Sequence, residues 1–245
     1  MQVKKQYIYI GIIIMNQSRN NDKELISIFN EELIELRDSL INMSQLVRNS
    51  LDQAIKSLVN KDRELAQQVI DNDEVVDRME LDIEEHCLQL IALKHPISKK
   101  LRVITSAMKA ISDLERVGDR AANIAGASKY LSSKPLVKPL VDIPRMAEIT
   151  QNMLKDSLDA YLRGDVELAK SVWEKDKLVD QLNQQIFREL LTFMLEDPHT
   201  ISRAIHLIFI SDNLERIGDH AGNLAERVVY IVDGQRIKEK IEHKK

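Results

Sequence analysis

The segment Asp113-Leu-Glu-Arg-Val-Gly-Asp-Arg-Ala-Ala-Asn-Ile-Ala125 recurs 100 residues later as Asn213-Leu-Glu-Arg-Ile-Gly-Asp-His-Ala-Gly-Asn-Leu-Ala225. Eight of the 13 positions are identical in the two copies. The similarity continues upstream at an offset of 103 residues, where the segment 62–77 matches the segment 165–180. The chain is therefore an internal duplication. Residue types kept in both copies can be distinguished from those that are free to differ.

Composition favours helices throughout. The chain has 245 residues, of which 30% are charged and only 4% are aromatic. Leucine, isoleucine, alanine, glutamate and lysine dominate, which favours helices over strands. Pro96 and Pro198 stand at matching places in the two copies, where they predict helix ends. We therefore predict an all-α protein whose two halves hold about 100 residues each.

Charge and cysteine content exclude several classes of protein. The formal net charge is -4 and the sequence pI is about 5.9. Binding to a phosphate backbone requires a cationic face, so nucleic acid is not expected as a partner. Cys87 is the only cysteine, which excludes an internal disulfide and a Cys-rich metal site. A single cysteine, which we expect to be a buried packing residue, fits a cytoplasmic protein.

Apolar residues recur at steps of three, four or seven, which indicates long amphipathic helices. The predicted helices cover about residues 25–58, 62–93, 98–131, 144–163, 165–195 and 200–232. Three antiparallel helices joined by short turns bury the apolar stripe of each helix in the simplest way. We predict two tandem, pseudo-symmetric three-helix bundles of six long helices, in residues 22–131 and 145–233. A proline-rich linker, expected to be extended, joins them over residues 132–144.

The two ends of the chain lie outside these bundles. The stretch from Tyr7 to Met15 holds nine mostly apolar residues, too few to cross a bilayer. We expect residues 1–21 to be a disordered extension, or part of an over-extended reading frame whose real start is Met15. Residues 234–245 are expected to form a charged tail.

Acidic residues recur on one face of the duplicated motif. Glu115 and Asp119 stand four residues apart, about 40° around and ~6 Å along a helix, so their carboxylates share a face. Glu215 and Asp219 repeat this spacing, and Asp212 precedes Glu215 by three residues. Like charges at such spacings repel each other by a few tenths of a kcal/mol per pair. Another interaction must therefore offset the repulsion.

The preceding helix of each half carries a second acidic stripe. Asp73, Asp77 and Glu80 form it in the first half, and Asp176 and Asp180 form it in the second. If the helices pack antiparallel, the stripes of each half face each other. Carboxylates without histidine or cysteine suit Mg, Mn, Ca or ferric iron better than zinc or copper. The competing interpretation is an ordinary solvated helix face, but retention in both copies favours ion sites.

Two further residue types are kept in both copies of the motif. Gly118 and Gly218 lie inside predicted helices, where glycine costs up to ~1 kcal/mol relative to alanine. Close approach by a neighbouring helix would explain them. For Arg116 and Arg216 we expect salt bridges to another helix rather than a role in catalysis.

No sequence feature predicts catalysis. The six histidines share no duplicated position, and the sequence holds neither a Gly-rich phosphate loop nor a nucleophile elbow. A di-iron carboxylate enzyme would carry Glu-x-x-His motifs on its helices. The only such string is Glu196-Asp-Pro-His199, which falls in a predicted turn. The residues therefore argue against a common catalytic histidine and a di-iron carboxylate site, and we assign no catalytic or cofactor-binding residues.

Together these motifs resemble one known family. The duplicated Leu-Glu-Arg-[Val/Ile]-Gly-Asp strings, the Asp-x-x-x-Asp pairs before them and the turn His95-Pro-Ile-Ser-Lys-Lys-Leu-Arg102 are similar to the PhoU family of bacterial phosphate-transport accessory and regulatory proteins. The resemblance covers about residues 24–233. It implies PhoU-like bundles whose acidic motifs bind metal clusters, with iron expected first and Mn, Mg or another hard divalent cation as alternatives. The implied metal ligands are Asp73, Asp77, Glu80, Glu115, Asp119, Asp176, Asp180, Asp212, Glu215 and Asp219.

The resemblance also implies a function without enzymatic activity. Such a protein is a negative regulator of phosphate uptake and of phosphate-starvation signalling, and it links an ABC phosphate importer to a sensor histidine kinase. The implied partners are the ATPase subunit of the importer, the phosphate-sensing histidine kinase and a second copy of the chain. The protein would meet the membrane only through these partners.

Two alternatives remain open from the sequence. One is a ferritin-like, metal-dependent oxidase or storage protein, which the missing Glu-x-x-His pairs disfavour. The other is an accessory protein of a different phosphate permease with the same helical bundle.

Overall fold

A computed structural model of the chain describes the backbone of residues 2–233 and the side chains of residues 31–233. Within this range the regular structure is helical, without a strand, so the predicted all-α class is confirmed. The helices are α1 (Gln2–Asn60), α2 (Arg63–Asp71), α3 (Asp73–Lys94), α4 (Ser98–Leu131), α5 (Asp142–Arg163), α6 (Val166–Glu196), the short 3-10 helix η1 (Pro198–Thr200) and α7 (Ile201–Asp233). The predicted charged tail at 234–245 lies outside the described residues.

Duplicated capping residues set the helix starts. Asp62 Oδ1 accepts hydrogen bonds from the backbone N–H groups of Glu64 and Leu65, at 3.0 and 2.9 Å. Asp165 Oδ1 accepts the equivalent bond from the N–H of Leu168 at 3.0 Å. These side chains satisfy amides that have no partner within the helix. Gly164, with a φ of 68°, ends α5 in the left-handed conformation that glycine adopts readily.

One predicted helix is interrupted. The sequence predicted a single helix over 62–93, whereas the structure ends α2 at Asp71 and begins α3 at Asp73. Asn72 N–H bonds back to the carbonyl of Gln68 at 3.0 Å, and the Asn72 carbonyl accepts from Val75 N–H at 3.1 Å. Three short polar residues in succession, 71–73, favour such local breaks because they are poor helix formers. The equivalent α6 has lysine at position 175 and continues without a break.

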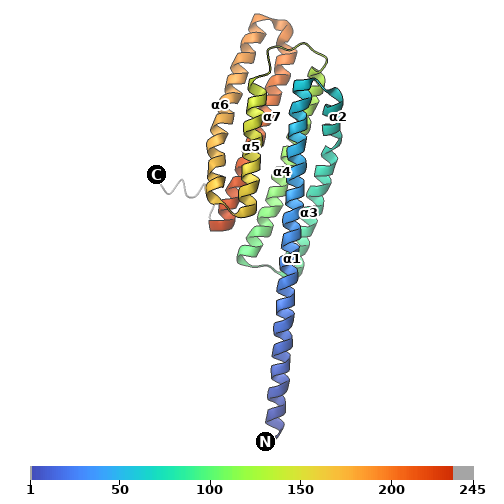
Figure 1. Ribbon diagram of the computed structural model, residues 1–245, viewed down its shortest axis with the longest axis vertical. Helices are drawn as coiled ribbons and strands as arrows, with labels where there is room; N and C mark the ends of the chain where they lie inside the picture. Colours follow the sequence, from blue (N-terminus) through green and yellow to red (C-terminus); the bar gives the residue numbers. More distant parts are fainter. Residues whose placement is uncertain (1, 234–245) are drawn as a thin grey trace, which may run out of the picture.

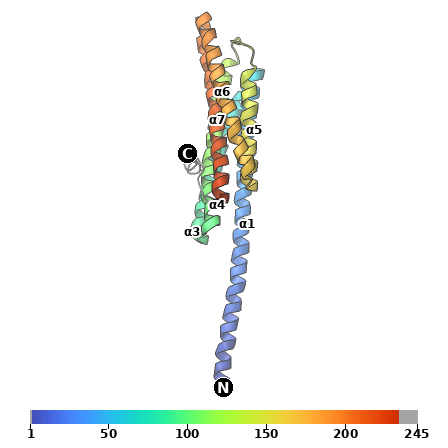
Figure 2. The same cartoon turned by 90° about the vertical axis from the view of Figure 1, so that its left-hand side faces the viewer.

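The N-terminal helix is longer than predicted. A disordered or separate extension was expected over residues 1–21, whereas the backbone forms one continuous helix, α1, from Gln2. The segment 2–24 contains no proline, the residue that most strongly interrupts a helix, although it does contain Gly11 and the short polar run Asn20-Asn21-Asp22. Figures 1 and 2 both show this part of α1 projecting beyond the other helices. Whether translation starts at Met15 stays a prediction.

The helices form two layers. In one layer α3, α4, α7 and α6 lie side by side in that order, with α2 against α4. In the other layer α1 covers α3 and α4, α5 covers α6 and α7, and α1 contacts α5. Figure 2 views these layers nearly edge-on. The result is a three-helix unit from α1 to α4, with α2 and α3 acting as one helix, beside a second unit from α5 to α7 (Figure 1).

A single apolar core runs through both units. Buried leucine, isoleucine, valine, methionine and alanine from every α-helix join one cluster. Burial at about 25 cal/mol per Å² of apolar area is the main stabilising contribution here. Cys87 lies in this core with no exposed area, as predicted, and burial raises the pKa of its thiol to about 12. No described helix is both apolar enough and long enough to cross a bilayer.

The linker between the units is anchored by a buried lysine. Residues 132–141 form turns without regular helix or strand, and α5 begins at Asp142 with Pro144 in its first turn. Lys138 Nζ donates to the carboxylates of Asp142, at 2.7 Å, and of Glu189 on α6. Burial by itself lowers the pKa of Lys138, but the two carboxylates reverse the effect and raise it. These contacts fix the linker against the second unit.

Candidate functional site

The predicted acidic residues gather at two equivalent helix pairs. Seam 1 lies between α3 and α4, which pack against each other. Its carboxylates are Asp73, Asp77 and Glu80 on α3 with Glu115 and Asp119 on α4. Seam 2 lies between α6 and α7 and holds Asp176, Asp180, Asp212, Glu215 and Asp219. The structure therefore brings every predicted acidic residue into one of two seams, five carboxylates in each.

The charges of seam 1 are partly withdrawn from water and repel each other. Burial, followed by repulsion from Asp119 and Asp77, raises the pKa of Asp73 to about 6. Burial and the nearby Asp119 raise the pKa of Glu115. Burial and Glu84 raise the pKa of Glu80, although Arg116 and a hydrogen bond from Ser112 act in the opposite direction. Repulsion between residues on different helices indicates that the two acidic stripes face each other.

Seam 2 repeats these electrostatics. Burial is the largest cause that raises the pKa of Asp176, and repulsion from Asp180 and Asp219 adds to it. Burial, then Asp219, raises the pKa of Glu215, and Arg216 partly offsets the effect. In both seams each perturbed carboxylate is disfavoured in its charged form. A bound cation would remove that penalty.

The duplicated glycines make room for the first aspartate of each stripe. A Cβ atom built on Gly118 would lie 3.1 Å from Val76 Cγ1 and 3.2 Å from Asp73 Oδ1. On Gly218 it would lie 3.4 Å from Asp176 Oδ1. The predicted close approach by a neighbouring helix is thus present. It brings a carboxylate rather than a bare backbone against each glycine.

One exchange across the helix pair keeps the number of carboxylates constant. In seam 1, Glu80 on α3 accepts a hydrogen bond from Ser112 on α4. In seam 2 the roles are reversed, because Asn183 Nδ2 on α6 donates to Asp212 Oδ1 on α7 at 3.1 Å. In seam 2 the acidic residue therefore lies on the second helix of the helix pair and the hydrogen-bond donor on the first. Each helix pair has one acidic residue and one donor at these two positions. Both seams therefore hold five of the predicted ligands, although Asn183 replaces a glutamate, whereas Glu84, beside Glu80 on α3, has Phe187 as its equivalent in α6.

The duplicated arginines lie along the seams. Arg116 Nε is 3.3 Å from Glu115 Oε2, and its Nη1 is 3.1 Å from Asp119 Oδ2. In the second copy Arg216 makes the same contacts within its own helix, at 3.4 and 3.0 Å. The expectation of salt bridges to another helix is therefore wrong. The reason is geometric, since residues three apart on a helix are neighbours.

The donor chemistry fits a hard cation, but the side chains do not form a closed coordination shell. All ten predicted ligands are carboxylates, the ligand type that Mg, Mn, Ca and ferric iron prefer. Among the residues whose side chains are described, no three Asp, Glu, His or Cys side chains stand together as a group that could hold one ion. Part of the reason is that Arg116 draws Glu115 and Asp119 toward its own guanidinium. Metal binding stays a prediction for these residues.

A buried polar network between the two units was not predicted from the sequence. Asp113 on α4 is only 7% exposed and accepts hydrogen bonds from three residues of α7. Arg227 Nε lies 3.0 Å and Asn223 Nδ2 3.2 Å from its carboxylate oxygens, and His220 Nδ1 lies 3.1 Å away. Burial would raise the pKa of Asp113, but the hydrogen bonds from His220 and Arg227 and the charge of Arg227 lower it below the ordinary value.

The sequence held a signal for this network. Position 113 carries aspartate where the second copy carries Asn213, and His220 and Arg227 replace Arg120 and Ala127. The duplication does not mark His220, because the equivalent position 120 is an arginine. A residue that differs between copies can still be important where the copies meet.

Comparison with known proteins places these features in a family. The family model described as "PhoU domain" matches two ranges of the chain, residues 40–127 and 143–228. The phosphate-specific transport system accessory protein PhoU homolog of Aquifex aeolicus is 44% identical over 208 residues, covering 85% of this chain and 94% of that protein. The homolog of Pseudomonas putida is 40% identical over 211 residues, covering 86% of this chain and 82% of that protein.

Solved structures agree with the sequence relatives. The crystal structure of PhoU from Pseudomonas aeruginosa superposes with a TM-score of 0.82 at 39% identity, covering 84% of this chain and 100% of that chain. The structure of the phosphate transport system regulatory protein PhoU from Streptococcus pneumoniae gives a TM-score of 0.79 at 32% identity, covering 85% and 98% of the two chains. The chain therefore belongs to the PhoU family.

Proposed function

We propose that the protein is an accessory and negative regulatory protein of phosphate uptake. Support comes from relatives that are named accessory proteins of the phosphate-specific transport system and that match most of this chain. The protein acts without catalysis, in the cytoplasm. It relays the state of an ABC phosphate importer to a phosphate-sensing histidine kinase, by contacts with the ATPase subunit and with the kinase, and it does so as a homodimer.

Metal binding at both seams is part of the proposal. The observation that carries it is the exchange of Glu80 and Ser112 for Asn183 and Asp212, which keeps the number of predicted carboxylate ligands at five in each seam. A merely solvated helix face has no reason to conserve that number. The ligands are the ten seam carboxylates, with iron or another hard cation. In each seam the arginine side chain leaves its two carboxylates when they turn toward the ion.

The ion would supply positive charge where burial and repulsion raise the pKa values of the carboxylates. It would thereby hold α3 to α4, and α6 to α7, in one arrangement. Such a cross-link gives a regulatory protein a rigid face to present to partners, without any chemical step.

The regulatory proposal is tested in cells that lack the gene. A reporter of the phosphate-starvation response should be strongly expressed in phosphate-replete medium, and the wild-type gene should restore repression. The same cells, carrying a tagged protein, should yield the importer ATPase subunit and the kinase on purification. A reporter that stays repressed without the gene would contradict the regulatory role.

A second experiment, with variants of the seam carboxylates, separates metal binding from regulation. Variants Glu115→Gln with Asp119→Asn, and Glu215→Gln with Asp219→Asn, remove two carboxylates from one seam each. Asp82→Asn, at an exposed position of α3 outside the seams, is the matched control. If metal supports regulation, the seam variants lose repression while the control keeps it. Full repression by a variant whose metal is gone would show that regulation does not need the ion.

A further inference from the structure

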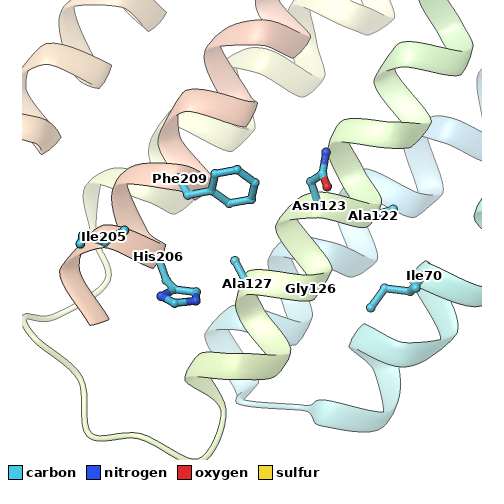
Figure 3. Close-up of a pocket in the computed structure, with 8 residues that line it drawn as sticks. All are labelled: Ile70, Ala122, Asn123, Gly126, Ala127, Ile205, His206 and Phe209. Carbon is cyan, nitrogen blue, oxygen red and sulfur yellow. The ribbon is translucent and has the colours of Figure 1, made fainter. Parts of the chain in front are cut away.

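An apolar groove lies between the C-terminal half of α4 and the start of α7. Its volume is about 600 Å³, and we call it the apolar groove. Its lining residues are Ile70, Ala122, Asn123, Gly126, Ala127, Ile205, His206 and Phe209. Figure 3 shows the Phe209 and His206 side chains on α7 facing Asn123 and Ala127 on α4, with Ile70 of α2 on the far side. Phe209 is 45% exposed and Ile205 is 52% exposed, so two large apolar side chains lie open to water.

The internal duplication supplies a comparison for this groove. The helices α4 and α7 form a second groove at the other end of their contact, of about 320 Å³ and lined by residues 100 positions removed. There Thr105, Ser106 and Lys109 replace Ile205, His206 and Phe209, and Glu226 and Arg227 replace Gly126 and Ala127. We call this second site the polar groove. One end of the molecule thus carries large polar side chains where the other carries small residues and exposed apolar ones.

The floor of the apolar groove can accept a rod-shaped partner. A Cβ atom built on Gly126 would meet no atom within 4 Å, so the backbone of α4 is open to close approach there. Ala122 and Ala127 continue this shallow floor on both sides. Ile205 and Phe209 are four residues apart and form one wall. A small-residue floor beside an apolar wall is the geometry into which an amphipathic helix packs its apolar face.

Unpaired cations stand at one end of the apolar groove. His206 stacks on Tyr130 with ring centroids 3.8 Å apart, and Lys134 Nζ lies 5.1 Å from the centre of the Tyr130 ring. Lys61 Nζ donates to the Lys134 carbonyl at 3.0 Å, and Arg203 Nη1 donates to the carbonyl of Pro135 at 3.0 Å. These contacts place Lys134 over the Tyr130 ring, next to His206 of the groove, and place Lys61 and Arg203 against the backbone of residues 134 and 135 just beyond it.

The charge of this cluster is not neutralised. Across the part of the chain whose side chains are described, Lys61, Lys134 and Arg203 form no ion pair with a carboxylate; their recorded partners are backbone carbonyls and an aromatic ring. The two closest aspartates in sequence, Asp62 and Asp197, accept hydrogen bonds from helix N-terminal amides instead. A local positive surface therefore exists in a chain whose net charge is -4.

We propose that the apolar groove docks an amphipathic helix of a partner protein, whose apolar face covers Ile205 and Phe209 and whose acidic residues meet Lys61, Lys134 and Arg203. Charge complementarity selects an acidic rather than a basic helix. The apolar contact supplies the affinity, and the cationic end sets the direction in which the helix lies. This docking site is separate from the seams and does not depend on metal.

The test uses two synthetic peptides and the full-length protein in buffer with a chelator. One labelled peptide is an amphipathic helix of about five turns with leucines at i, i+3, i+4 and i+7 and glutamates at one end. The second has lysines in place of the glutamates. Fluorescence anisotropy should give a dissociation constant about tenfold lower for the acidic peptide than for the basic one.

Variants that copy the polar groove make the test specific. Gly126→Glu and Phe209→Lys, each of which installs the residue found 100 positions away, should weaken binding of the acidic peptide by about tenfold. Lys134→Glu should shift the preference toward the basic peptide. Lys109→Ala, in the polar groove, is the matched control and should leave binding unchanged. Circular dichroism verifies that each variant is folded.

Two results would overturn the proposal. One is equal binding of the acidic and basic peptides by the wild-type protein, including no binding of either. The other is binding of the acidic peptide that neither Phe209→Lys nor Gly126→Glu weakens. Because the chelator removes metal from every sample, neither result depends on whether the seams hold ions or on whether the protein regulates phosphate uptake.

Discussion

Asp113 and Asn213 hold equivalent positions in the two copies but meet different surroundings. Asp113 pairs with Arg227 and His220, whereas position 127, the equivalent of Arg227, is alanine. Asn213 is 2% exposed and its Oδ1 has no partner, and Arg120 Nε is likewise buried without one. Unsatisfied buried polar atoms destabilise a protein unless water reaches them. The contact between the units thus contains a hydrogen-bonded polar network around Asp113. Around the equivalent residue Asn213, on the other side of the pseudo-symmetry axis, buried polar atoms lack partners.

Removing the charge of Asp113 should destabilise the protein markedly. Asp113→Asn leaves the partly buried Arg227 guanidinium without its counter-ion, so we expect a loss of about 2–3 kcal/mol in the free energy of unfolding. Denaturant unfolding measures it. In a double-mutant cycle, Arg227→Met added to Asp113→Asn should cost less than the sum of the single variants. A loss below about 0.5 kcal/mol for Asp113→Asn would show that the pair is dispensable.

Asp73 should make the metal-free protein sensitive to pH. Its pKa is about 6 in the folded protein and 3.8 as a free side chain, so folding favours the protonated form. Its contribution to stability is complete below pH 3.8 and is lost as the pH rises to about 6. In a chelating buffer, Asp73→Asn should therefore raise the melting temperature at pH 7.5 by about 2–4 °C and have little effect near pH 4.

Thermal unfolding of the wild type and Asp73→Asn across this pH range checks the expectation. Asp82→Asn, which removes an exposed carboxylate from the same helix, serves as the control. A gain in melting temperature for Asp73→Asn that is the same at both ends of the pH range would refute the assigned direction.

At the scale of elements, the spacing of helices in each seam depends on one glycine. Gly118 on α4 faces Val76 and Asp73 on α3, and Gly218 on α7 faces Asp176 on α6. The two contacts differ in tightness, because a Cβ atom would be 3.1 Å from its nearest neighbour at Gly118 and 3.4 Å at Gly218. The first distance is too short for an ordinary carbon contact, whereas the second is acceptable.

Alanine should therefore have opposite effects at the two glycines. Alanine gains up to ~1 kcal/mol from helix propensity at either position. At Gly118 the crowding of buried Val76 costs about 1–3 kcal/mol, so Gly118→Ala should be net destabilising. Gly218→Ala should be neutral or stabilising. Chemical denaturation of the two variants gives the comparison, and the account of the seams fails if Gly118→Ala is the more stable of the two.

Periodicity and capping residues were sufficient for most helices. Asp62, Asp165 and Gly164 end or begin helices where predicted, because capping is local chemistry that a sequence displays directly. The break at Asn72 was missed, since apolar periodicity persists across it and only backbone hydrogen bonding reveals it. The continuous start of α1 was also missed. The change in composition near residue 22 predicts a boundary there, and α1 continues across it.

On the scale of the whole molecule, the duplication predicted two equivalent acidic seams, and the structure places all ten carboxylates in them. The duplication did not predict that α4 packs against α7. Tertiary packing decides which helices of the two units contact each other. A repeated helical pattern in the sequence does not predict this packing. The network at Asp113 and the two unlike grooves both lie at this contact. The network and the grooves involve positions at which the two copies differ. Comparing only the residues that the copies share therefore does not identify them.

Metal content tests the central claim, that both seams hold hard cations, most directly. Protein purified without chelator from its native host should retain iron or another hard cation by elemental analysis. Glu115→Gln with Asp119→Asn should remove about half of it, Glu215→Gln with Asp219→Asn the other half, and all four changes nearly all of it. Asp82→Asn should leave the content unchanged. Wild-type protein free of metal, or metal that survives all four changes, would contradict the account.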